Sequence, residues 1–344
     1  MREIRLYPAG DVRVEEAPDA PAVAIRPETT VVVETGYSVL SPGTEGGIIR
    51  RVREHGMADL PFFRLGYCAA GRVAAAGSEV AGLAPGQRVA CYGGPYVTHS
   101  SRLWVPHTLI APLPDAVSER EAAFAGLGGI AIHGLRVARL QFGESVVLLG
   151  LGILGQLAAQ VGVAAGYRVF ALDLKAERLA LAQEAGVERA LPAGCDPEEE
   201  VKAATGGAGA DAVLVFAASK SPEVIAQALR LVRPQGRVVV VGDVDLSLNR
   251  DLMFSSEAEV VVSRAAGPGR YDPHHERDGQ DYPLGYVRWT EGRNLREFVR
   301  LLGLGKISLS PLISDEAPLE DAPSVYERLL CDSSSVMGVL FRHA

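Results

Sequence analysis

The sequence lacks paired cysteines. Its 344 residues include four cysteines, and no two of them stand in a Cys-x-x-Cys spacing. Widely scattered cysteines are typical of reduced thiols in a cytosolic protein, so the pattern argues against a disulfide framework. The first residues, Met-Arg-Glu-Ile-Arg, also lack an apolar signal core, and we therefore expect a cytoplasmic protein.

Long apolar runs and basic clusters are missing too. No segment reaches the ~18 uncharged apolar residues of a membrane-spanning helix, so we expect no membrane partner. A formal charge of −8 without a basic cluster argues against a nucleic-acid partner. With 48% hydrophobic and 22% charged residues, the composition is that of a globular protein long enough for two domains.

A strand followed by three closely spaced glycines is the most informative pattern that is present. An apolar run over 146–149 leads into Gly150, Gly152 and Gly155, and an alanine-rich helix is expected over 154–163. In a dinucleotide site the first glycine permits the tight turn, the second lets backbone approach a pyrophosphate, and the third packs helix against strand. The helix N-terminus would stabilise the phosphates. The pattern favours a nicotinamide dinucleotide over FAD or S-adenosylmethionine.

A carboxylate follows at a suitable distance. The apolar strand 168–172 ends in Asp173, 18 residues after Gly155, where a carboxylate could hold both ribose hydroxyls of an adenosine. We expect NAD rather than NADP, because Asp173 would repel a 2′-phosphate; Lys175 and Arg178 lie close enough in sequence to keep NADP as the alternative. The expected cofactor-binding residues are Gly150, Gly152, Ile153, Leu154, Gly155, Asp173, Leu174, Arg178, Phe216, Ala217, Val241, Gly242 and Ser263.

Two kinds of pattern divide the chain. Up to about residue 115, short β-rich runs are broken by turn residues such as Pro42-Gly43, which predicts a small barrel or sandwich. From residue 118, strands and helices alternate, which predicts an open parallel sheet with helices on both faces. The segment 267–294, rich in aromatic and charged residues, is then expected to be a long loop, and such loops are uncommon without a function.

An ordered set of motifs resembles the medium-chain dehydrogenase/reductase superfamily, whose members are zinc-type alcohol dehydrogenase-like. The motifs are Gly66-Tyr67-Cys68-Ala69-Ala70-Gly71-Arg72-Val73, Pro85-Gly86-Gln87-Arg88-Val89, Gly150-Leu151-Gly152-Ile153-Leu154-Gly155 and Gly305-Lys306-Ile307 with Pro311-Leu312-Ile313. The resemblance implies an α/β fold: a Rossmann doubly wound parallel sheet over 118–265, and a GroES-like β-rich catalytic domain over 1–117 and 266–344. It also implies a homodimer or tetramer.

The loop 267–294 and the run Ser41-Pro42-Gly43-Thr44-Glu45 resemble a zinc-less branch, the dehydrogenase half of bacterial bi-domain oxidoreductases. Zinc-dependent members of the family hold zinc with a Cys, a His-Glu pair and a further Cys or Glu. By this resemblance, Ser41, Tyr67-Cys68 and Gly126 stand at those positions here. Serine and tyrosine are poor zinc ligands and glycine offers no side chain, so we expect no metal.

Without zinc, other groups must handle the alcohol proton, and the expected catalytic residues are Tyr67, Glu45, Thr44 and Cys68. Tyr67 can donate a proton to a developing alkoxide, or it can simply fill the space of the metal. Glu45 is either a general base or a structural carboxylate at a turn.

The loop is expected to contact substrate through Tyr271, Tyr286, Arg288 and Trp289, because aromatic rings stack on sugar faces and arginine gives directional hydrogen bonds. The charged residues Arg270, Asp272, Glu276 and Glu291 are expected to supply further hydrogen bonds to the substrate. The alternative is that some of the loop's polar groups form an internal salt-bridge network or a dimer contact.

These expectations together describe an NAD-dependent, zinc-independent oxidoreductase that interconverts a secondary alcohol and a ketone. The small-molecule substrate would be a sugar, cyclitol or other polyol. The alternatives are a zinc-free quinone or enone reductase, an isomerase or lyase that uses tightly bound NAD for transient oxidation, and a cofactor-binding protein that has lost catalysis.

Overall fold

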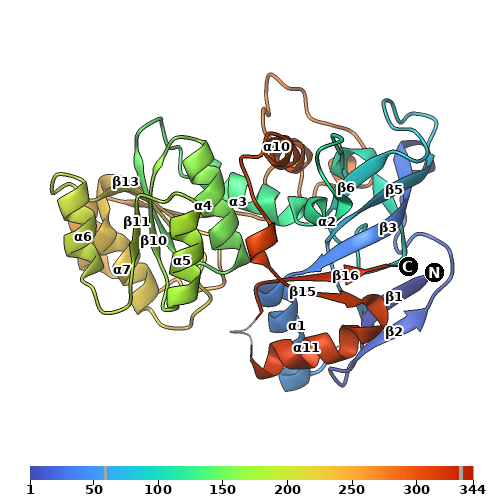
Figure 1. The fold of residues 1–344 in the computed structure, drawn as a ribbon, viewed down its shortest axis with the longest axis horizontal. Coiled ribbons are helices and arrows are strands. Elements are labelled where there is room, and N and C mark those ends of the chain that lie inside the picture. The colour runs from blue at the N-terminus through green and yellow to red at the C-terminus, as the bar shows by residue number, and fades with distance from the viewer. Residues whose placement is uncertain (58–59, 333–335, 344) are drawn as a thin grey trace. The chain divides into compact units, whose positions relative to one another are not determined.

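The computed structural model describes residues 1–57, 60–332 and 336–343, and the chain forms two compact units (Figure 1). Residues 130–267 and 305–308 form one, here called the parallel-sheet unit; residues 1–129, 268–304 and 309–344 form the other, the mixed-sheet unit. The sequence placed the first boundary earlier, between residues 117 and 118. Helix α3 (Ala125–Val137) runs across the observed boundary.

The parallel-sheet unit is built on six parallel strands in the order β11-β10-β9-β12-β13-β14. They are β9 (Ser145–Leu149), β10 (Arg168–Leu172), β11 (Arg189–Leu191), β12 (Ala210–Val215), β13 (Val232–Val240) and β14 (Glu259–Val262). The helices between them are α4 (Ile153–Ala164), α5 (Ala176–Glu184), α6 (Pro197–Ala204), α7 (Glu223–Leu231) and α8 (Arg250–Ser256). Unbroken Val/Leu runs suit strands buried on both faces, and β9 is buried throughout. This is the predicted doubly wound Rossmann sheet, and its strand order reverses beside β9.

The mixed-sheet unit contains a seven-stranded and a three-stranded sheet. The larger sheet has β3 (Thr30–Leu40), β5 (Cys68–Ala76), β6 (Arg88–Tyr92), β7 (Arg102–Pro106), β8 (Ile110–Pro112), β15 (Ile313–Pro318) and β16 (Gly338–Arg342); the smaller has β1 (Arg2–Leu6), β2 (Val12–Glu16) and β4 (Phe63–Arg64). Its helices are α1 (Pro42–His55), α2 (Glu119–Ala122), α9 (Pro273–Glu276), α10 (Glu291–Gly303) and α11 (Ala322–Cys331). This is the β-rich, GroES-like domain that the resemblance implied. None of the helices in the described residues is long and apolar enough to cross a membrane.

Helix α1 corrects the sequence interpretation, which placed a turn at Pro42-Gly43. Pro42 is instead the first residue of a 14-residue helix, where its fixed φ and missing N–H are tolerated. Buried Ile49 joins an apolar cluster with Tyr326 and Leu329 of α11, and α1 and α11 lie side by side (Figure 1). This packing stabilises a helix whose glycines disfavour it.

Candidate functional site

Each glycine of the triplet has its own steric reason in the turn between β9 and α4. Gly150 has φ +94°, and a Cβ there would lie 2.8 Å from the backbone nitrogen of Ala217. A Cβ on Gly155 would lie 2.0 Å from the carbonyl oxygen of Gly150, so helix and strand could not approach as they do. Gly152 is the N-cap of α4, and a Cβ there would meet nothing within 4 Å. The space beside Gly152, next to a helix N-terminus, fits a pyrophosphate.

Asp173, at the end of β10, is bound to this turn. Its Oδ2 accepts a hydrogen bond of 2.6 Å from the backbone N–H of Leu151, and its Oδ1 accepts one of 2.9 Å from that of Lys175. The guanidinium of Arg178 lies 3.5 Å from Oδ2. Asp173 therefore fixes the glycine turn as well as placing a negative charge beside it, and Leu174, 89% exposed, follows directly.

The other expected cofactor residues gather at the carboxyl edge of the same sheet. Phe216 and Ala217 follow β12, and the backbone N–H groups of both donate to the carbonyl of Leu149. Val241 and Gly242 follow β13, and their N–H groups donate to Val215. Buried Ser263 follows β14. In a doubly wound sheet this edge is where ligands bind, so these separate loops form a candidate cofactor surface.

Three hydroxyl groups meet in the mixed-sheet unit, where α1 begins beside the start of β5. The Tyr67 hydroxyl donates to Ser41 Oγ over 2.6 Å and lies 3.5 Å from Thr44 Oγ1. Burial raises the pKa of Tyr67, so its phenol keeps its proton at neutral pH. Ser41 is buried and Thr44 is exposed. The cluster can supply a proton to an oxygen that gains negative charge.

Glu45 is placed beneath this hydroxyl cluster. Its Oε1 accepts a hydrogen bond of 2.8 Å from the backbone N–H of Ser41, while its Oε2 lies 3.0 Å from His99 Nε2 and accepts from the Tyr326 hydroxyl. The side chain of Glu45 is only 2% exposed. Three such neighbours favour the structural alternative for Glu45 over the role of general base. Glu45 lies in the first turn of helix α1, whereas the sequence interpretation placed it at a loop turn.

No sequence motif predicts the rest of this network. His99 Nδ1 lies 2.7 Å from Ser38 Oγ, which lies 2.9 Å from His343 Nε2. Burial lowers the pKa of His343 to about 3, so this ring is neutral at neutral pH. These three residues stand far apart in the chain and in no recognisable motif, and only the strand pairing of the mixed-sheet unit brings them together. They form a buried polar support below Ser41.

The residues at the family's metal positions do not fit zinc. The Ser41 and Tyr67 hydroxyls are hydrogen-bonded to each other, and a Cβ on Gly126 would lie 2.5 Å from both Cys68 Sγ and a ring carbon of Tyr92. Burial, with Glu45 adding to it, raises the pKa of the Cys68 thiol well above its usual value, whereas zinc binds the thiolate. Among the described residues, no group of three or more His, Cys, Asp or Glu side chains is arranged to hold a metal ion.

The segment 267–294 contains internal polar contacts, which the sequence left open as the alternative to substrate contact. Arg270 pairs with Glu276, and the Tyr282 hydroxyl donates to Asp272, so these polar groups form internal contacts. The four expected substrate residues lie elsewhere on the segment. Tyr271 is 56% exposed beneath the Arg270 guanidinium, Tyr286 is 91% exposed, and the Arg288 guanidinium lies 3.8 Å above the half-buried Trp289 ring.

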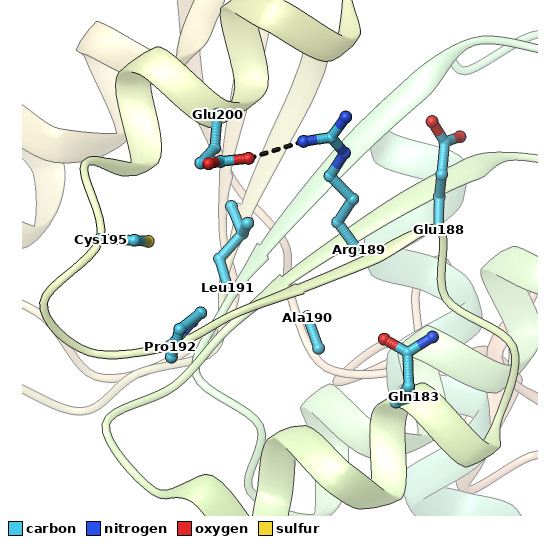
Figure 2. Close-up of a pocket in the computed structure, with 8 residues that line it drawn as sticks. All are labelled: Gln183, Glu188, Arg189, Ala190, Leu191, Pro192, Cys195 and Glu200. Atoms are coloured by element: carbon cyan, nitrogen blue, oxygen red, sulfur yellow. Dashed lines mark hydrogen bonds and ion pairs between the residues drawn. The ribbon is translucent and has the colours of Figure 1, made fainter.

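One hollow of about 450 Å³ is lined by none of the expected site residues. It is a surface groove of the parallel-sheet unit around β11, where Arg189 and Glu200 pair at 2.6 Å (Figure 2). Burial, Glu200 and Asp196 raise the pKa of its Cys195 thiol, which makes that thiol a poor nucleophile. The groove therefore adds nothing to the candidate site.

The chain is similar in sequence to known dehydrogenases and reductases. The Zinc-binding dehydrogenase family matches residues 154–275. D-guloside 3-dehydrogenase of Escherichia coli (strain K12) is 29% identical over 289 residues, which cover 81% of this chain and 78% of that protein. D-xylulose reductase of Saccharomyces cerevisiae is 28% identical over 221 residues, covering 62% and 55% of the two chains.

Solved structures share the fold over the whole chain. Alcohol dehydrogenase TADH from Thermus sp. ATN1 has a TM-score of 0.77 at 23% identity and covers 100% of both chains. Galactitol-1-phosphate dehydrogenase from Escherichia coli has a TM-score of 0.79 at 22% identity and covers 99% of this chain and 100% of its own.

Proposed function

Because the chain belongs to the medium-chain dehydrogenase/reductase superfamily, we propose that it is an NAD-dependent oxidoreductase that interconverts a secondary alcohol and a ketone without a metal ion. The observation that supports the metal-free part is the 2.6 Å hydrogen bond between the Tyr67 and Ser41 hydroxyls, at positions that resemble the zinc-ligand positions of the family. The proton chemistry of these hydroxyls replaces the Lewis acid.

Tyr67 acts as the general acid in the reducing direction. When a ketone accepts hydride, its oxygen gains negative charge, and the neutral Tyr67 phenol gives that oxygen a proton. Ser41 orients the phenol, and Glu45 in turn holds Ser41 through the backbone N–H. In alcohol oxidation the reverse step applies, and the alcohol gives its proton to the Tyr67 phenolate as its hydride leaves. Cys68, which keeps its proton, contributes packing rather than acid–base chemistry.

The parallel-sheet unit binds the dinucleotide. Gly152 leaves space for the pyrophosphate, the first turn of α4 offers backbone N–H groups to it, and Asp173 accepts from the adenosine ribose. When bound, the nicotinamide ring takes up or supplies the hydride. An assay for NADH formation over a panel of polyols, sugars and simple secondary alcohols tests this function, and turnover of none of them would contradict it.

Asp173→Asn should lower the preference for NAD over NADP by roughly 10-fold, because it removes a negative charge that faces the 2′ position. The neighbouring Arg178 would then attract the 2′-phosphate without competition. Titration of both cofactors measures the ratio. Asp211→Asn is the matched control, since Asp211 also accepts from backbone at Ser145 but lies at the start of β12. Tighter NADP binding by the unaltered protein would contradict the assignment.

The substrate is a polyhydroxylated compound. Two supports are the sugar and polyol names of the relatives above and the exposed aromatic and arginine side chains at 271–289. A polyhydroxylated compound offers partners to the Arg288 guanidinium, whereas an apolar alcohol offers none, and a buried donor without a partner costs roughly 1–3 kcal/mol. We also propose a homodimer or tetramer, which light scattering on the purified protein tests.

Trp289→Ala should lower kcat/KM for the best polyol by roughly 10- to 100-fold and leave the Kd of NAD nearly unchanged. Since Arg288 stacks on Trp289, Arg288→Ala should give a similar loss, and the double variant should lose little more than the worse single one. Phe142→Ala, which removes a 91% exposed ring from the parallel-sheet unit, is the control. If either loop variant melts much earlier or loses NAD binding in proportion to activity, the loop is structural.

A further inference from the structure

Three ionisable side chains are buried together in the mixed-sheet unit. Arg270 and Glu276 form an ion pair in which the two side chains are only 10% and 7% exposed, and Glu291, the first residue of α10, is fully buried. A second nitrogen of Arg270 donates to the carbonyl of Gly94 over 2.7 Å. Buried charges are expensive unless each is paired, so the protonation state of this group matters.

Glu291 has no donor for its carboxylate. Neither side-chain oxygen has a hydrogen-bond partner among the described residues, although its backbone N–H donates to Pro268. Burial, followed by the charge of Glu276, raises the pKa of Glu291 to about 9. Protonation of Glu291 removes one buried negative charge, and the neutral carboxyl group can then donate its O–H to the Glu276 carboxylate. The group then holds one cation, one anion and one neutral acid.

This group lies behind the proposed acid. The titratable and charged groups that face Glu291 are Glu276, Arg270, Tyr92 and Tyr282. Among them, Tyr92 links the group to the hydroxyl cluster, because its ring packs edge-on against Tyr67 with centroids 6.2 Å apart. An ionised Glu291 would place uncompensated negative charge behind Tyr92 and oppose negative charge on a substrate oxygen beside Tyr67.

We propose that Glu276 and Glu291 share one proton, which holds Arg270 in place behind Tyr92 and keeps uncompensated negative charge away from the Tyr67 hydroxyl. Glu291 is thus a positioning residue for the reaction. The catalytic half of this inference rests on the proposed function; the shared proton does not. A buried acid that costs stability is more common at functional sites than elsewhere, which supports a functional reason for it.

The shared proton is tested by stability against pH. A folded-state pKa above the ordinary value means that the folded chain binds more protons than the unfolded chain between about pH 4.5 and about pH 9. Glu291 therefore makes stability fall as pH rises through that window. Glu291→Gln keeps a donor towards Glu276 but cannot ionise, so it should gain stability relative to wild type as pH rises. Glu297→Gln, at a half-buried position of the same helix where Glu297 pairs with Arg300, should keep the wild-type slope.

The catalytic half is tested by the pH profile of ketone reduction. Wild-type kcat should fall above about pH 9. Glu291→Gln should remove that fall and keep kcat at neutral pH within a few-fold of the wild-type value. Glu291→Leu should lower kcat at least 10-fold, because the Glu276 carboxylate loses its hydrogen-bond donor. An unchanged stability slope in Glu291→Gln would overturn the shared proton. A changed slope with an unchanged kcat profile would overturn the catalytic half. Full activity of Tyr67→Phe would contradict the proposed function. The stability measurement on Glu291→Gln would still decide whether Glu276 and Glu291 share a proton.

Discussion

Replacing Tyr67 with phenylalanine should lower kcat/KM for ketone reduction by roughly 10²- to 10⁴-fold, the usual contribution of a general acid. The substitution removes one hydroxyl and leaves the ring, so the edge contact with Tyr92 should remain. Since Tyr67 belongs to the mixed-sheet unit, NAD affinity should stay the same. Single-turnover reduction with NADH separates this loss in the chemical step from product release.

Two further variants make the test of Tyr67 specific. Ser41→Ala removes the acceptor of the 2.6 Å hydrogen bond and should cost less, roughly 10-fold, because the phenol remains but is less well oriented. Tyr7→Phe removes a hydroxyl that donates to Glu15 at 3.2 Å and should leave kcat unchanged. A Tyr67→Phe protein with kcat near wild type would show that the ring merely fills the space of the lost metal.

Gly155→Ala and Gly152→Ala should affect stability and cofactor binding differently. A Cβ on Gly155 would lie 2.0 Å from the backbone carbonyl of Gly150, so the turn must open. Gly155→Ala should therefore lose roughly 1–3 kcal/mol or more of unfolding free energy together with cofactor binding. A Cβ on Gly152 would meet nothing within 4 Å of the protein, and its φ of −64° suits alanine. The free energy of unfolding of Gly152→Ala should therefore lie within about 1 kcal/mol of the wild-type value.

Gly152→Ala should nevertheless raise the Kd of NAD by roughly 10- to 100-fold, because its methyl group would enter the space proposed for the pyrophosphate. Denaturant unfolding and cofactor titration on the same samples separate the two effects. Gly43→Ala is a control in α1, where a Cβ also meets nothing within 4 Å, and it should leave NAD binding unchanged. Equal NAD affinity in Gly152→Ala and wild type would contradict the proposed cofactor site.

Short-range chemistry explains what could be predicted from the sequence. The order of strand, glycine triplet, helix, strand and Asp173 predicts a Rossmann sheet because each glycine meets a local steric requirement of the turn. The structure confirms this sheet. Asp173 was predicted as a ribose contact, yet its bond to the Leu151 N–H was not foreseen, because the pattern says nothing of what else a carboxylate accepts.

Long-range packing explains what could not be predicted. Helix α1 contains Gly43, Gly46 and Gly47 and has little intrinsic helix propensity, and its partner α11 comes more than 250 residues later. The contact between Glu45 and His99 has the same cause, since no local pattern identifies a buried partner. Within the loop, the sequence could not decide which charges pair with each other and which side chains stay exposed. That division appears only once Arg270 meets Glu276.

The most direct test of the central claim is turnover of a polyol by protein from which metal has been exhaustively removed, with metal content measured on the same sample. Ser41, Tyr67 and Gly126 offer zinc no suitable set of ligands, so the metal-depleted protein should keep its full NAD-dependent rate, and added zinc should not increase it. One zinc ion per chain in the active protein, with activity lost on depletion and restored by zinc, would contradict the metal-free mechanism.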